Sequence, residues 1–192
     1  MTRTAFLVSG LIGLCASVSH GEIVYSGVLD ITVGANNNHD TTIAGYTYWW
    51  GIDSTFLWDA HILPQSPGAG YFVTVEQSDW VRNFGSGQSI GADSGVIVDA
   101  IDYFGILHQY SSPVGGYFPA EGTGFVGIAM GEADNRLFGW MRFSLGNGSF
   151  LTLHDWAYES NLNQSIEAGA IPAPGAIAVA ALAGLASRRR RR

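Results

Sequence analysis

Turn-forming residues interrupt the middle of this chain so often that short strands are its expected elements. Clusters rich in glycine, asparagine and proline occur at residues 34–38, 64–70, 85–87, 113–116 and 147–148. The segments between them are rich in β-branched and aromatic residues and alternate with a period of about two residues, as strands do. No segment keeps the apolar period of about 3.6 residues that marks an amphipathic helix. The sequence therefore predicts an all-β fold, a single antiparallel β-sandwich or jelly-roll-like domain.

The strand pattern can be assigned segment by segment. We predict strands at residues 23–33, 42–52, 55–62, 71–77, 79–83, 125–130, 137–145 and 150–158. The segment Gly95–Leu107 fits a strand or a short helix, and its pattern leaves both open.

Residues 137–158 carry the clearest pattern, two strands joined by Gly146-Asn147-Gly148, which supplies the positive-φ residues of a tight hairpin. Alternation predicts which side chains share a face. On the first strand Phe138, Trp140 and Arg142 oppose Met141, Phe143 and Leu145, and on the second Phe150, Thr152, His154 and Trp156 oppose Leu151, Leu153 and Asp155.

The distribution of charge excludes one class of partner. All sixteen acidic residues lie between Glu22 and Glu167, together with only three of the nine basic residues. Such a body repels phosphate backbones, so we expect no nucleic-acid binding. The one cysteine, Cys15, lies in the N-terminal apolar run. If that run is removed, the mature domain has no thiol for a disulfide or a zinc site.

The N-terminus has the layout of a secretory signal peptide. Arg3 is followed by an apolar stretch from Ala5 to Ala16 and then by small residues, with cleavage sites after Ser19 or Gly21. The alternative is a buried N-terminal helix. We predict a signal helix in residues 1–21 and the β domain in residues 22–168, on an exported protein.

The C-terminus, residues 169–192, combines three features in a fixed order. The tripeptide Pro172-Ala173-Pro174 comes first, and an apolar run at residues 175–187 follows it. The apolar run predicts a transmembrane helix. This helix would be short, because a comfortable span needs roughly 20 residues. The chain closes on Arg188, Arg189, Arg190, Arg191 and Arg192, which we expect to remain cytoplasmic and stop transfer. An amphipathic helix docked on the acidic body is the alternative.

This order resembles the PEP-CTERM sorting signal of exported bacterial proteins, with Ala173 where the family carries glutamate and Gly175 after the second proline. Parts of the body also resemble the domains that carry such signals. The matching segments are Phe138-Gly139-Trp140, Arg142, Asp155–Glu159, Ser165–Gly169 and Asn83–Ser94. The resemblance implies an exosortase-type membrane protease as partner, transient membrane anchoring, and delivery to the cell envelope, cell surface or extracellular matrix.

No motif for catalysis stands out, and we predict no catalytic residue and no enzyme. The histidines have no metal-ligand spacing, and a G-x-S-x-G motif does not occur. A Ser-His-Asp triad built from distant residues stays open. A glycan-active hydrolase, the third functional hypothesis, would need two carboxylates about 5–10 Å apart. The candidates are Asp53, Asp59, Glu76, Asp79, Asp99 and Asp102.

Carbohydrate binding is the second hypothesis, with extracellular polysaccharide as the partner. Tryptophans could stack on sugar rings, and the candidates are Trp49, Trp50, Trp58 and Trp80. Since Trp49 and Trp50 are neighbours on one strand, they should face opposite sides. Core packing is the alternative role for these rings.

We predict no metal site and no cofactor, with calcium as the alternative. Two oxygen-rich loops, Gly34–Thr42 and Gly115–Gly122, could supply calcium ligands. Both also fit solvated turns whose asparagines accept positive φ.

Overall fold

A computed structural model describes residues 21–53, 59–73, 80–99, 104–110 and 116–172. Within these ranges the elements are strands, and their ladders are antiparallel, which confirms the predicted all-β class. A search of the same residues finds no helix long and apolar enough to cross a membrane. The signal segment and the chain from residue 173 onward lie outside the described part.

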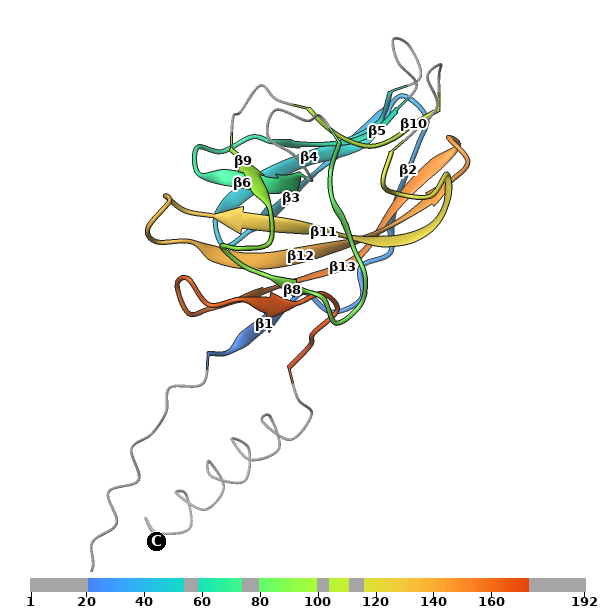
Figure 1. The fold of residues 1–192 in the computed structure, drawn as a ribbon. Helices are drawn as coiled ribbons and strands as arrows, with labels where there is room; N and C mark the ends of the chain where they lie inside the picture. The colour runs from blue at the N-terminus through green and yellow to red at the C-terminus, as the bar shows by residue number, and fades with distance from the viewer. Residues whose placement is uncertain (1–20, 54–58, 74–79, 100–103, 111–115, 173–192) are drawn as a thin grey trace, which may run out of the picture.

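Two sheets and one short ladder build the body (Figure 1). The larger sheet has the order β1 (Ile23–Tyr25), β13 (Phe150–Glu159), β12 (Leu137–Gly146), β11 (Glu121–Met130), β6 (Ala69–Val73) and β9 (Val96–Val98), with β2 (Ile31–Gly34) on β13 and β7 (Asn83–Phe84) on β11. The smaller sheet has the order β10 (Gly105–Gln109), β5 (Asp59–Pro64), β4 (Tyr46–Asp53) and β3 (Asn37–Ile43). The ladder pairs β14 (Ile166–Glu167) with β8 (Ser89–Ile90).

The main core lies between the two sheets. Alternation along β4 points Trp50 to this interior, and alternation along β12 points Phe143 toward it from the other sheet. Their rings lie 5.3 Å apart in an edge-to-face arrangement. The same core holds Tyr48, Ile52, Met141, Leu145, Leu151 and Leu153. This face-to-face packing of antiparallel sheets is sandwich-like.

A second core covers the opposite face of the larger sheet. Phe138 and Trp140 of β12 are buried there with Ile90 of β8, Ile166 of β14 and Ala168. Strand β8 contacts β12, and Figure 1 shows β8 and the red strand β14 side by side next to β13 and β1. The predicted division of β12 into two faces is therefore right, and both faces are apolar because both are covered.

The hairpin between β12 and β13 forms as predicted, with Asn147 at φ 47° and Gly148 at φ 75°. The strand predicted at residues 42–52 is right for β4, but its start is wrong. Ala44 and Gly45 adopt φ 50° and 87° and turn the chain between β3 and β4. Two consecutive positive-φ residues are what a tight hairpin requires.

The single strand predicted at residues 23–33 is also wrong, for a reason that lies in β13. His154 is an extra residue in the ladder, because Arg142 pairs with Asp155 while Phe143 pairs with Leu153. Residues 26–30 leave the sheet opposite this bulge, and the N–H of Leu29 donates to the oxygen of His154 at 2.7 Å. The bulge also puts Asp155 on the face opposite Leu153, contrary to strict alternation.

The remaining strand predictions are right in part. Strands β5, β6 and β11 overlap the ranges predicted at 55–62, 71–77 and 125–130, whereas β7 shares only Asn83 with the range predicted at 79–83. The open segment Gly95–Leu107 begins with β9 and ends in β10, so its described parts are strands. Residues 54–58, 74–79 and 100–103 lie outside the described chain.

Tyr48 links the two sheets and should make the fold sensitive to alkali. Its buried hydroxyl donates to the oxygens of Gly70 and Ala129 at 3.3 and 3.1 Å, and burial raises its pKa far above the ordinary value. Above about pH 10 the unfolded chain ionises first, so the contribution of Tyr48 to stability falls by about 1.4 kcal/mol per pH unit. Tyr48→Phe removes this ionisation.

Urea unfolding at about pH 8 and about pH 11, on either side of the ordinary tyrosine pKa, measures the effect. The native protein should be more stable than Tyr48→Phe at the lower pH by about 1 kcal/mol, and this advantage should vanish at the higher pH. The same stability difference at both pH values would contradict the burial of this hydroxyl. Other tyrosines titrate equally in both proteins.

Candidate functional site

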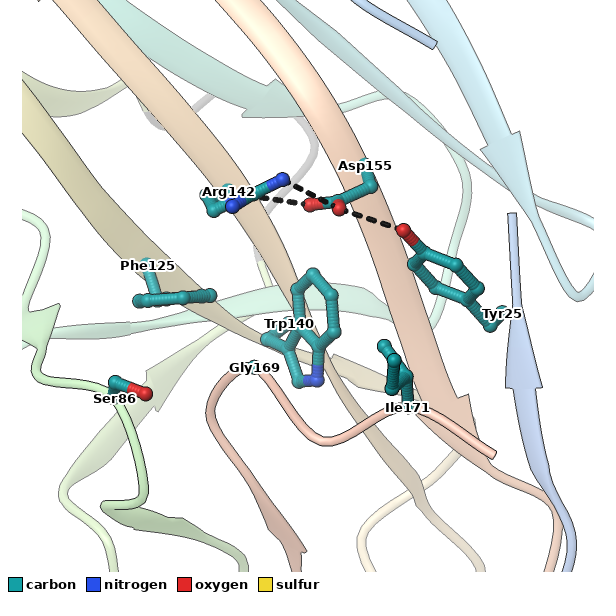
Figure 2. A pocket seen from close by; sticks show the side chains of 8 residues that line it. All are labelled: Tyr25, Ser86, Phe125, Trp140, Arg142, Asp155, Gly169 and Ile171. Atoms are coloured by element: carbon teal, nitrogen blue, oxygen red, sulfur yellow. Dashed lines mark hydrogen bonds and ion pairs between the residues drawn. The ribbon is translucent and has the colours of Figure 1, made fainter. Parts of the chain in front are cut away.

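A pocket of about 310 Å³ lies on the outer face of the larger sheet, where both described ends of the chain converge. Figure 2 shows the residues that line it. Tyr25 comes from β1, Trp140 and Arg142 from β12, and Asp155 from β13, and Ile171 belongs to the segment that leads out of the body. Segments far apart in sequence therefore build one wall.

An ion pair forms the polar wall of the pocket. Arg142 donates from Nε and Nη2 to the two carboxylate oxygens of Asp155, at 2.8 and 2.7 Å. The hydroxyl of Tyr25 donates to the same carboxylate at 2.8 Å. The Asp155 side chain is 5% exposed and that of Arg142 is 36% exposed, so the guanidinium is the more open partner. Burial, and next the hydrogen bond to Asp155, raise the pKa of Tyr25.

Aromatic rings form the apolar wall. The ring of Trp140 lies between those of Phe125 and Tyr25, with centroids 5.5 and 6.3 Å away. Trp140 is buried, and its Nε1–H has no hydrogen-bond partner among the described residues. Gly169, at φ 83°, passes close by, and a Cβ there would lie 3.2 Å from Phe125 Cζ. Glycine thus lets the C-terminal segment approach the rings.

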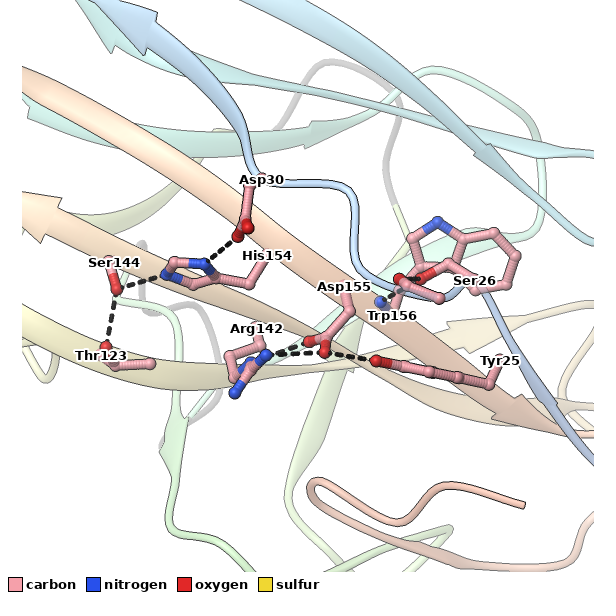
Figure 3. Close-up of polar contacts among 10 residues, drawn as sticks. Tyr25, Ser26, Asp30, Thr123, Arg142, Ser144, His154, Asp155 and Trp156 are labelled. Carbon is pink, nitrogen blue, oxygen red and sulfur yellow. Dashed lines mark hydrogen bonds and ion pairs between the residues drawn. The ribbon is translucent and has the colours of Figure 1, made fainter. Parts of the chain in front are cut away.

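A second polar network lies beside this wall on the same sheet (Figure 3). His154 bonds through Nδ1 to Asp30 at 2.6 Å and through Nε2 to the Ser144 hydroxyl at 2.7 Å. The Ser144 hydroxyl also bonds to Thr123 at 2.6 Å. The β13 bulge places His154 over Ser144 while Asp155 faces Arg142. Aspartate, histidine and serine thus stand in the order of a catalytic triad.

The surroundings of Ser144 favour a structural ladder over a nucleophile. Ser144 lies near the end of β12 and is paired with Thr123 on one side and Thr152 on the other. Backbone N–H groups of a strand paired on both sides are used in its ladders. Acyl transfer needs free donors for the developing oxyanion, and this strand supplies none from its backbone. Side-chain hydrogen bonds across strands also stabilise sheets without any chemistry.

Comparisons with known proteins add no relative. The chain matches no family model, no curated protein and no solved structure.

The predicted sugar-stacking tryptophans do not form one platform. Trp50 is fully buried in the main core, where its Nε1–H donates to Thr41 at 2.9 Å, so its predicted role in stacking is wrong. Trp49 faces the other side of β4, as predicted for neighbours, and lies 5.2 Å from His61 and 6.1 Å from Phe104. Trp80 is half-buried beside β10, and Trp58 lies outside the described residues.

Two of the predicted carboxylates meet on the smaller sheet. Asp53 and Asp59 are directly opposite in the β4–β5 ladder, and the Asp59 carboxylate bonds to His61 Nδ1 at 3.0 Å. Asp99 instead pairs with Arg136 at 2.9 Å on the surface. Glu76, Asp79 and Asp102 lie outside the described chain.

The two loops considered for calcium serve the fold. Asn36, at φ 60°, turns the chain between β2 and β3, and Asn37 belongs to β3. In the second loop Phe118 enters the main core, and the oxygen of Ala120 accepts from the N–H of Asn147. No group of three or more His, Cys, Asp or Glu residues that could hold a metal occurs in the described ranges.

Sequence reasoning did not find the pocket as a site. The sequence pointed to Arg142 and Asp155 only through the resemblance to domains that carry PEP-CTERM signals. Tyr25 is 130 residues from Asp155, so no local pattern connects the two. One signal was available: Arg142 is one of only three arginines in the acidic body, and it lies on a strand face with Phe138 and Trp140. A charge on such a face predicts a buried partner.

Proposed function

We propose that this chain is an exported bacterial cell-surface or extracellular-matrix protein, a jelly-roll-like domain sorted by its C-terminal segment. An exosortase-type membrane protease recognises Pro172-Ala173-Pro174 and cleaves near it. The apolar run at residues 175–187 anchors the chain in the membrane until cleavage, and Arg188–Arg192 hold its end in the cytoplasm.

One structural observation supports the proposal: the hydrogen-bonded body closes immediately before the motif. The N–H of Ala168 donates to Gln88 and that of Ala170 to Glu167, at 2.8 and 2.9 Å. Ile171 is already 53% exposed. A protease that needs an extended segment can therefore reach Pro172 without unfolding the described body.

The position of the two described ends is also consistent with proteolytic removal of the N-terminal leader and the C-terminal tail. Both ends leave the body on the same side (Figure 1), and Tyr25 and Ile171 line the same pocket. Loss of the segments beyond them removes no strand of either described sheet. The domain can remain folded while both ends are processed.

Deletion of Arg188–Arg192 tests the sorting proposal. We expect either release of the protein into the medium or accumulation of an unprocessed form, because nothing then holds the apolar run across the membrane. Fractionation and mass measurement of the expressed protein are the readouts. Replacement of the five arginines by lysines should preserve sorting, whereas five glutamines should not. Unchanged location and mass after the deletion would refute the proposal.

A further inference from the structure

The pocket beside the C-terminal segment has two hydrogen-bond donors that no described residue uses. Trp140 is 1% exposed, and its buried Nε1–H has no partner among the described residues. Such an unpaired buried donor costs about 1–3 kcal/mol, so buried donors nearly always meet an acceptor. Arg142 uses Nε and Nη2 on Asp155 and leaves Nη1 uncommitted in the described structure. Both residues line the pocket.

The Arg142–Asp155 pair offers donors and acceptors side by side. Its two parallel hydrogen bonds hold the guanidinium and the carboxylate in one plane. Arg142 Nη1 faces away from the carboxylate and can donate to one hydroxyl. Asp155 Oδ1 accepts only from Arg142 Nε and can accept from another hydroxyl, whereas Oδ2 already accepts from Arg142 and Tyr25. A carboxylate or phosphate could only accept.

The other wall suits the apolar face of a ring. Phe125 and Tyr25 are half-buried and flank Trp140, so part of each ring faces the space between them. A cavity lined by aromatic groups with a few polar ones is the usual design of a small-molecule site. At about 310 Å³ this pocket has room for a small ring, near the lower end of the usual range.

The charge of the body selects the kind of ring. Sixteen acidic residues and only three arginines lie between the two terminal segments. The field of such a body disfavours the approach of an anion. The one arginine in the pocket is already neutralised by Asp155. An uncharged polyhydroxyl ring is not repelled by the negative body and does not need an unpaired arginine.

We propose that this pocket binds one neutral sugar residue of a polysaccharide. Hydroxyls of the ring contact Arg142 Nη1 and Asp155 Oδ1, and the ring packs against Phe125, Tyr25 and Trp140. This gives the exported domain a ligand, and it does not depend on how the tail is processed.

Indole NMR of the full ¹⁵N-labelled chain, in a detergent without sugar groups, tests the site. Trp140→Phe identifies the Trp140 signal and keeps an aromatic ring. Titration with methyl glucoside and methyl mannoside should shift this signal saturably with at least one of them, while the Trp49 signal, identified by Trp49→Phe, stays in place. Cyclohexanol, which has a single hydroxyl, should have no saturable effect.

Arg142→Lys keeps the charge but removes the planar pair, and should weaken binding about tenfold or more. Circular dichroism confirms that this variant is folded, and Trp140→Phe provides a second, independent loss of affinity. Absence of a saturable Trp140 shift with both glycosides would overturn the proposal. An equal response to cyclohexanol, or a response to methyl glucuronate alone, would overturn the assignment to a neutral pair of hydroxyls.

Discussion

Replacing Arg142 with methionine should lower the free energy of unfolding by about 3–5 kcal/mol, because it leaves a carboxylate buried without its counter-charge. The Asp155 side chain is 5% exposed and receives two hydrogen bonds from Arg142. After the substitution only the Tyr25 hydroxyl still donates to it. Methionine replaces the apolar stem of the side chain and omits the guanidinium, so the loss reports mainly the charge and its hydrogen bonds.

A double substitution separates the effect of the buried charge from the effect of lost packing. In Arg142→Met/Asp155→Leu the buried charge is gone, and a large part of the lost stability should return. The pair of Arg136 and Asp99 is the control, because its carboxylate is exposed. Arg136→Met leaves the Asp99 side chain, which is 54% exposed, in contact with water, so stability should change by no more than about 1 kcal/mol. Urea unfolding of the four proteins measures these differences. Equal small losses at both pairs would contradict a buried pair at Asp155.

Trp50→Ala should destabilise the protein as much as Arg142→Met, lowering the free energy of unfolding by about 3–5 kcal/mol. Trp50 has no exposed surface and packs against Phe143 of the opposite sheet. Its removal leaves a cavity between the sheets and takes the hydrogen-bond donor away from Thr41, which is itself buried. A cavity of this kind lies where the two sheets cannot close on it without shifting.

The neighbouring tryptophan is the matched control for this prediction. Trp49 is half-buried on the other face of the same strand. Trp49→Ala should therefore cost clearly less than Trp50→Ala, since less surface returns to water. Denaturant unfolding of the two variants compares them directly. Losses of the same size would show that the assignment of the two faces of β4 is wrong.

The parts of the fold that could be read from the sequence are those governed by local pattern. Strand β12 alternates cleanly, β13 does so up to the bulge at His154, and Asn147-Gly148 is a strong turn signal, so both strands and their hairpin were predicted. The turn at Ala44-Gly45 was missed because alanine rarely adopts positive φ, which hides the first of its two turn residues.

Features that depend on pairing between distant segments could not be read in this way. The bulge at His154 is a change of register between β12 and β13. The break between β1 and β2 lies opposite this bulge. The pocket likewise joins β1, β12, β13 and the C-terminal segment. A period-two pattern predicts which residues share a face of one strand, but it does not tell which other strand lies beside it.

The most direct test of the proposed function is the intact mass of the native protein recovered from its host. The proposal predicts a chain that has lost the N-terminal leader up to about residues 19–21. It must also have lost the apolar run and the arginines that follow Pro172-Ala173-Pro174. A molecule with all 192 residues, found in the cytoplasm, would contradict export and sorting together.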